Sequence, residues 1–216
     1  MRFVLFALAP MMFFGCETTE DETGPVDMSE AFPVGGNSSW EFLNANATVS
    51  YTLIGSLAQD RTDESLYTIK YVKHCMAVDE TCVEGELVRS LTLSNDANNG
   101  VLIHGTNDAG IETVYEPPLT MAAAEMYQSD QMITQTAGFT WTSTLVATEE
   151  CPVVITGGIA EQCVRISLSD GGMGETNSGL VGEYWATAGY GIVAMDVASD
   201  EGRWELRDYA EGEDTL

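Results

Sequence analysis

The sequence predicts an all-β protein with a single domain, built as an antiparallel β-sandwich or as a rolled, half-open β-barrel. From Trp40 onward, short runs rich in Thr, Val, Ile, Tyr and Trp are separated by Gly, Asn and Asp, which is the composition of strands and tight turns. The connections are too short for the crossover helices of a βαβ fold. No second change in composition marks a domain boundary.

Strand-like segments follow one another along the chain. We expect strands at residues 39–44, 47–55, 65–75, 82–94, 100–106, 111–116, 139–148, 163–169, 181–187, 190–197 and 202–209. Two of these segments alternate apolar and polar residues, as half-buried strands do. In segment 65–75, we expect Tyr67, Ile69 and Tyr71 to share a face. In segment 82–94, we expect the same of Val83, Leu87, Leu91 and Leu93.

Three short segments indicate how the strands connect. The sequence "NDAG" at 107–110 predicts a tight hairpin turn, and "ATAGYG" at 186–191 predicts a turn or a bulge at its glycines. Residues 121–133 form the one weakly helical stretch. After two prolines, this stretch is either a short helix or an extended connection across one end of the barrel.

The chain is strongly acidic, with 8 Lys and Arg residues against 34 Asp and Glu residues and a formal net charge of −26. Such a charge repels nucleic acids and anionic lipid headgroups, so we exclude nucleic-acid binding. Calcium binding, a cationic partner or a hydrated surface would each explain the acidity. We favour the hydrated surface because the acidic residues are spread over the chain. The segments 94–100 and 170–177 come closest to a calcium loop, but their composition is typical of turns.

Residues 1–16 have the charge order of a secretory signal peptide. Arg2 precedes an apolar run over residues 3–14, which is shorter than the roughly 20 residues of a membrane-spanning helix. Gly15 and Cys16 close this run directly. The segment resembles a bacterial lipobox, in which the cysteine thiol carries a diacylglycerol and the peptide is cleaved just before that cysteine.

This resemblance implies a division of the chain into three parts. Residues 1–15 are a lipoprotein signal peptide, residues 16–31 are an acidic tether lipidated at Cys16, and residues 32–216 are the all-β domain. The resemblance also implies a location in the bacterial cell envelope. There we expect the lipid to anchor the protein to the outer membrane, with the domain on the periplasmic or the surface-exposed side.

The remaining cysteines form an even set, which can pair fully in an oxidising compartment. They are Cys75, Cys82, Cys151 and Cys163. Three pairings are possible, and the sequence favours Cys75 with Cys82 and Cys151 with Cys163, because each pair flanks what looks like a hairpin connection. A zinc site is the competing interpretation, but zinc knuckles space their cysteines by two to four residues. We therefore predict two structural disulfides and no metal site.

Two further stretches resemble a broad group of bacterial envelope lipoproteins of unassigned function. "FPVGGNSSWEF" at 32–42 is similar to the opening pattern of that group, and "GEYWATAGYGIVAMD" at 182–196, with "WEL" at 204–206, is similar to its closing pattern. These motifs mark strand starts and turns, so the resemblance implies a β-rich envelope domain and no catalytic residues. Within that domain, Asn37 suits a turn and Trp40 begins the first buried strand.

Enzymatic motifs are absent from the sequence. It contains no G-x-S-x-G, no H-E-x-x-H and no P-loop. The two histidines, His74 and His104, could share a metal ion if their strands were neighbours, but a hydrogen-bonded or surface histidine is the simpler interpretation. We therefore predict no catalytic residues, no cofactor and no enzyme. A hydrolase that uses acidic residues is the least favoured alternative.

Two non-enzymatic functions follow from these observations. The favoured one is a structural or protein-interaction module of the envelope, which docks through exposed aromatic residues or a strand edge. The alternative is a carrier of a lipophilic ligand in a half-open barrel. Its cavity would be lined by methionines, which adapt to variable shapes, although such residues more often belong to an ordinary core. The candidates are Met121, Met126, Met132, Met173 and Met195.

Overall fold

Strands form every regular element of the described chain. The computed structural model describes residues 24–28, 38–44, 49–60, 65–75, 83–153, 162–171, 179–198 and 202–210. Its strands are β1 (Val26–Asp27), β2 (Ser39–Asn44), β3 (Val49–Asp60), β4 (Ser65–Cys75), β5 (Leu87–Asp96), β6 (Gly100–Asp108), β7 (Ile111–Ala122), β8 (Glu125–Met126), β9 (Gln131–Gln135), β10 (Thr140–Glu150), β11 (Gln162–Asp170), β12 (Gly182–Thr187), β13 (Gly191–Val197) and β14 (Trp204–Ala210).

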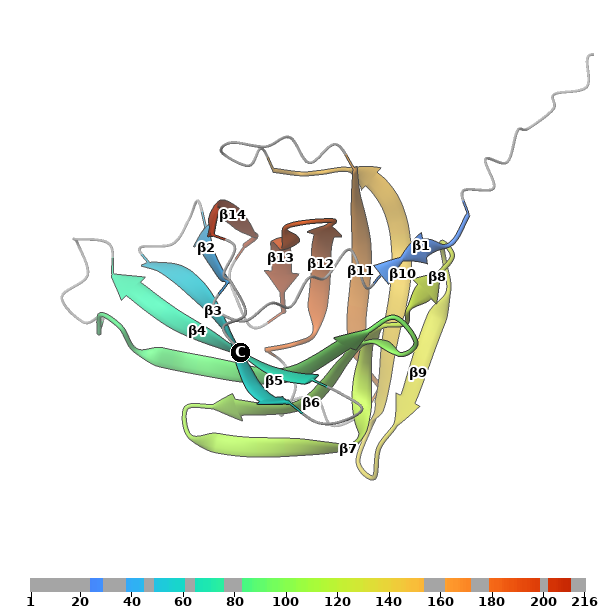
Figure 1. Ribbon diagram of the computed structural model, residues 1–216, viewed down its shortest axis with the longest axis horizontal. Coiled ribbons are helices and arrows are strands. Elements are labelled where there is room, and N and C mark those ends of the chain that lie inside the picture. The colour runs from blue at the N-terminus through green and yellow to red at the C-terminus, as the bar shows by residue number, and fades with distance from the viewer. Residues whose placement is uncertain are drawn as a thin grey trace, which may run out of the picture.

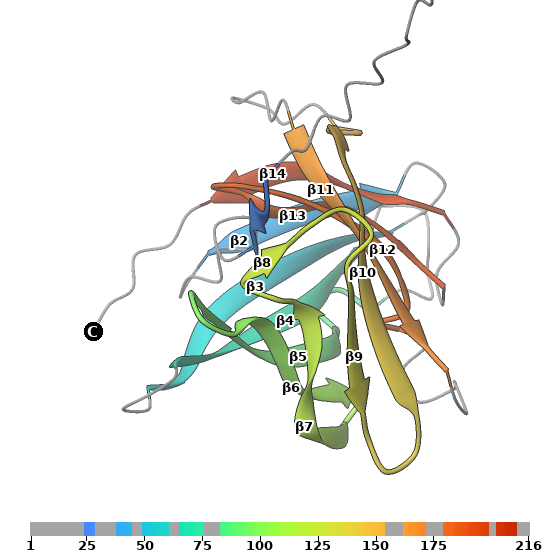
Figure 2. The ribbon, with the colours of Figure 1, turned by 90° about the vertical axis from the view of Figure 1, so that its right-hand side faces the viewer.

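All strands but two belong to one antiparallel sheet, which rolls into a nearly closed barrel (Figures 1 and 2). The sheet has 12 strands in the order β7-β6-β5-β4-β3-β2-β14-β13-β12-β11-β10-β9. Each strand from β2 to β6 pairs with the next along the chain, and so does each strand from β9 to β13. Pairing of β14 with β2 joins these two meanders. The prediction of a single all-β domain is thereby confirmed, and the rolled barrel is the correct one of its two forms.

The two ends of the sheet, β7 and β9, lie beside one another without pairing as strands. Side chains of β9 and of its neighbour β10 contact β7 instead, at what we call the seam. The indole nitrogen of Trp141 donates to the carbonyl oxygen of Thr120 at 2.8 Å, and the hydroxyl of Ser143 donates to the carbonyl oxygen of Met121. The hydroxyl oxygens of Thr120 and Thr134 are 3.3 Å apart. These contacts satisfy backbone groups that a ladder would otherwise pair.

Side chains from both meanders fill the barrel. The largest almost completely buried ones are Trp141, Phe42, Met28, Ile103, Leu119, Met126, Leu145, Ile166, Leu168, Val101 and Val193. Met28 directly follows β1, and Met126 belongs to β8, where it pairs with Val26. Trp40 is also buried, and its indole nitrogen donates to the carbonyl oxygen of Tyr190 at 2.6 Å. Asn37 lies outside the described residues.

The connections agree with most sequence-based expectations. Ala109 and Gly110, between β6 and β7, have φ angles of 50° and 91°, as the two-residue turn of a tight hairpin requires. The β12–β13 turn contains Gly189 at φ 81°, and the register of these strands shifts beside it. Residues 121–133 take the extended alternative, because they form the end of β7 together with β8 and β9. The helical alternative is wrong.

The expected common face of Val83, Leu87, Leu91 and Leu93 is only half right. Leu91 and Leu93 are buried, whereas Leu87 and Val83 are 50% and 61% exposed. Val83 lies before β5, and the cause at Leu87 is a bulge: Tyr71 pairs with Arg89 and Val72 pairs with Leu87, so that β5 carries one extra residue. An extra residue reverses which side chains face the core.

Candidate functional site

The predicted disulfide between Cys151 and Cys163 is confirmed. It joins the residue after β10 to the second residue of β11, with the two Cα atoms 4.8 Å apart. Cys163 is buried. Cys75, at the end of β4, is also disulfide-bonded, but Cys82, its predicted partner, lies outside the described residues, and so does Cys16.

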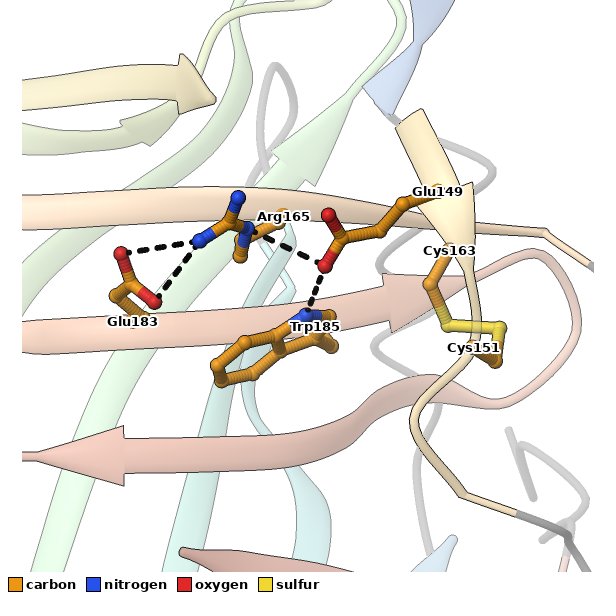
Figure 3. A network of polar contacts seen from close by, with 6 residues as sticks. All are labelled: Glu149, Cys151, Cys163, Arg165, Glu183 and Trp185. Carbon is orange, nitrogen blue, oxygen red and sulfur yellow. Dashed lines mark hydrogen bonds and ion pairs between the residues drawn. A yellow bond between two sulfur atoms is a disulfide. The ribbon is translucent and has the colours of Figure 1, made fainter. Parts of the chain in front are cut away.

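A polar network surrounds Trp185 close to the confirmed disulfide (Figure 3). The indole nitrogen of Trp185 donates to Glu149 Oε1 at 2.7 Å, and Arg165 forms ion pairs with Glu149 at 3.2 Å and with Glu183 at 3.3 Å. The guanidinium carbon of Arg203 lies 4.4 Å from the centre of the Trp185 ring, a cation–π distance. This network ties β10, β11 and β12 together, and we assign it a structural role.

The two histidines do not come together. His74 lies on β4 and His104 on β6, with β5 between these strands. His74 Nδ1 is 2.6 Å from Glu84 Oε1, while the other carboxylate oxygen accepts the backbone N–H of Cys75. This backbone bond and the contact with His74 hold the pKa of Glu84 below its ordinary value of 4.5. Within the described ranges, no three His, Cys, Asp or Glu side chains gather in an arrangement that could hold a metal ion.

A serine and a histidine lie within hydrogen-bond distance at Ser94 and His104, whose Oγ and Nε2 atoms are 2.9 Å apart. A nucleophile beside a base is the arrangement that acyl transfer requires. However, Ser94 is only 1% exposed, so its hydroxyl is not presented to a substrate. We interpret this bond as an anchor for His104, which is the extra residue where the register of β5 and β6 shifts.

Inside the barrel, the most distinctive polar group is Arg89. It lies on the inner face of β5, pairs in register with Asp108 of β6, and forms a hydrogen-bonded ion pair with that carboxylate. Burial by itself would lower the pKa of Arg89. The hydrogen bond and charge of Asp108 outweigh this effect, so the pKa lies above its ordinary value. The guanidinium also donates to the carbonyl oxygen of Gly179.

A small cavity of about 60 Å³ lies beside Arg89. Its lining is Tyr71, Val88, Arg89, Gly179, Tyr184, Met195 and Val197. A cavity of this volume holds a few water molecules and is too small for an acyl chain. Met121, Met126 and Met195 are buried in the core, Met132 is 36% exposed, and Met173 lies outside the described residues.

The outer face of β4 to β7 carries a larger, polar groove of about 320 Å³. Its lining is Thr68, Ser90, Thr92, His104, Gly105, Thr106, Asn107, Glu112, Thr113 and Val114. At Gly105 the backbones of β6 and β7 approach closely, because a Cβ atom there would come within 2.7 Å of the carbonyl oxygen of Thr113. One border of the groove, from Glu112 to Val114, is the edge of β7.

Exposed apolar side chains are concentrated near the two sheet ends. Among the residues that the structure describes, the large ones are Ile54, Val83, Leu87, Ile111, Val114, Tyr127, Met132 and Ile133. Of these, Ile111 and Val114 lie on β7, Met132 and Ile133 lie on β9, and Tyr127 lies just before β9. An edge strand that exposes apolar side chains is a surface on which another chain can pair. Sequence analysis missed this site because β9 was not predicted and the seam depends on tertiary structure.

Comparison with protein-family models, with curated proteins and with solved structures finds no match. None of the described segments is a helix long and apolar enough to cross a lipid bilayer. The fold and the site therefore define the class: an all-β, single-domain protein with a nearly closed barrel of 12 antiparallel strands, whose sheet ends expose apolar side chains.

Proposed function

We propose that this protein is a lipid-anchored, non-catalytic module of a bacterial envelope that acts through contact with other proteins. Attachment through Cys16 is supported by the charge order, length and lipobox-like end of residues 1–16. The disulfide between Cys151 and Cys163 supports an oxidising compartment. Because a lipid on Cys16 would hold the domain at the membrane, this proposal requires no membrane-binding surface on the domain itself.

The observation that carries the interaction function is the contrast, within the described residues, between large side chains buried inside the barrel and apolar side chains exposed at the sheet ends. The barrel interior contains large buried residues such as Trp141 and Phe42, whereas Ile111 and Val114 on β7 are 73% and 65% exposed. Surfaces of this kind are typical of sites where a partner docks. The carrier function has less support, because the cavity beside Arg89 is small and has a charged wall.

The lipid anchor is tested by mass spectrometry. Intact mass of the full chain, expressed in a bacterium with two membranes, is expected to match cleavage before Cys16, addition of lipid, and loss of four hydrogens for two disulfides. The variant Cys16→Ser is the control and is expected to lack the lipid. A wild-type mass that retains Met1, or one without lipid, would contradict the anchor.

The interaction function needs a separate test in the envelope. Photo-crosslinking side chains would be placed singly at Ile111, Ile133, Leu87 and Arg207, which sample different exposed surfaces. Discrete protein adducts from at least one position are expected. Organic extraction of the purified domain is expected to release no ligand. Stoichiometric lipid in the extract, with no adduct at any position, would instead favour the carrier.

A further inference from the structure

We propose that the open edge of β7, from Ile111 to Glu116, binds an extended, basic segment of a partner protein as an additional strand. This inference rests on the proposed interaction function and specifies its surface and its partner. The edge is open because β7 pairs with β6 alone among the described strands. The seam contacts to Thr120 and Met121 lie further along β7 and do not involve the first half of the strand.

The hairpin turn decides which backbone groups of β7 face outward. In a two-residue hairpin, the pair that closes the turn is hydrogen-bonded, and the next pair is not. Asp108 and Ile111 close this turn, and Asn107 pairs with Glu112. The N–H and C=O groups of Glu112 therefore point away from β6, and by the same alternation so do those of Val114, which is opposite Gly105. These groups form the template for an added strand.

The side chains next to this template offer both an apolar contact and a groove. Ile111 and Val114 are exposed, and the groove of about 320 Å³ begins at Glu112 and Val114. Because alternate side chains of a strand point to the same face, every second side chain of an added strand would lie over this groove. The hydroxyl and amide groups of Thr92 and Asn107 lie within its lining.

Charge identifies the kind of partner. No Lys or Arg occurs between Arg89 and Arg165, while Glu112 and Glu116 are both exposed on this edge. Carboxylates and prolines on an edge strand keep like strands from pairing, so a second copy of this acidic chain is disfavoured. The same carboxylates attract a basic strand, and they repel anionic lipid headgroups. A partner segment that alternates basic and apolar residues fits both the charge and the exposed apolar side chains.

The test uses a short synthetic peptide of alternating lysine and valine as the probe, titrated into the full chain. Amide hydrogen exchange is expected to slow at Glu112 and Val114, and the affinity is expected to fall as salt is raised. A peptide N-methylated at alternate residues, which cannot form the ladder, is expected to lose binding. A peptide of alternating glutamate and valine is expected not to bind.

Variants of the chain distinguish strand pairing at the edge of β7 from non-specific electrostatic attraction of the peptide. Glu112→Gln with Glu116→Gln is expected to weaken peptide binding about three- to tenfold. The control, Asp196→Asn with Glu205→Gln, makes the same charge change at exposed positions on β13 and β14 and is expected to have little effect. Val114→Pro removes an outward N–H that β6 does not use and is expected to abolish binding while the fold is kept. If Val114→Pro unfolds the domain, the glutamine variants still decide the question.

Three results would overturn the inference. They are equal binding of the N-methylated peptide, equal weakening by both pairs of charge variants, and slowed exchange confined to β9. Each would show that peptide attraction is diffuse or located elsewhere. None would overturn the proposed interaction function, because crosslinked adducts from other surfaces would remain. Conversely, absence of every adduct would contradict that function even if the probe peptide bound.

Discussion

Arg89 on β5 donates a hydrogen bond to the carbonyl oxygen of Gly179, which lies in the turn before β12. In the order of the 12-stranded sheet, β5 is third and β12 is ninth. The side chain therefore connects walls that face one another across the barrel, while Asp108 neutralises its charge. A barrel without a complete backbone ladder gains rigidity from such a contact.

Replacement of Arg89 by Met is expected to lower the free energy of unfolding by about 1 to 3 kcal/mol, because Asp108 loses its partner. The estimate is below that of a fully buried pair, since the two side chains are 22% and 39% exposed. Urea denaturation measures the change. The control Arg207→Met breaks a 3.9 Å surface pair with Glu41 and is expected to cost less than about 0.5 kcal/mol. Equal costs for the two variants would contradict the role of Arg89.

The seam is expected to be sensitive to Ser143. Ser143→Ala leaves the buried carbonyl oxygen of Met121 without its donor and is expected to cost about 1 to 2 kcal/mol. Amide exchange in β9 should become faster, because Ser143 lies on β10, where it pairs with Met132 of β9, and the variant loses the contact of β10 with β7. Ser169→Ala, an exposed serine on β11, is the control and should stay within about 0.5 kcal/mol of the wild type. Unchanged exchange in β9 would show that Ser143 does not help to close the barrel.

The disulfide between Cys151 and Cys163 spans a sequence separation of 12 residues. Replacing both cysteines by serine is expected to destabilise the domain by about 3 kcal/mol in the chain-entropy model. Thermal and urea unfolding under non-reducing conditions measure the loss. A double variant that keeps the stability of the wild type would imply that the Glu149–Arg165–Trp185 network suffices to hold the hairpin.

The pKa of Glu84 is expected below 4.5 when measured by NMR of its carboxyl carbon. Because the folded-state pKa is depressed, the stabilisation from Glu84 is present above about pH 4.5 and is lost as the pH falls through the lower, folded-state value. Glu84→Gln is therefore expected to reduce the dependence of stability on pH in this window. Glu86→Gln, which changes a neighbouring exposed carboxylate paired with Lys73 at 3.8 Å, is the control. A pKa at or above 4.5 would contradict the two hydrogen bonds.

Local sequence patterns predicted much of the fold. The expected segments 39–44 and 65–75 coincide with β2 and β4, and the hairpin at 107–110 has the turn that its residues require. Short alternating segments with Gly and Asn between them specify strands and turns, because both depend on neighbours along the chain. The same local reasoning missed β1, β8 and β9, which are short strands, and β1 pairs with β8, far away along the chain.

By itself, the sequence determined the all-β class, the strand alternation, the acidic charge and the pairing of Cys151 with Cys163. Tertiary structure alone decided that 12 strands roll into one nearly closed barrel, that the bulge in β5 turns Leu87 outward, and that β7 keeps an open edge. The physical reason is the range of the interactions. Strand propensity and turn geometry act between neighbouring residues, whereas barrel closure and edge exposure depend on contacts such as Trp141 with Thr120, which join segments far apart in the chain.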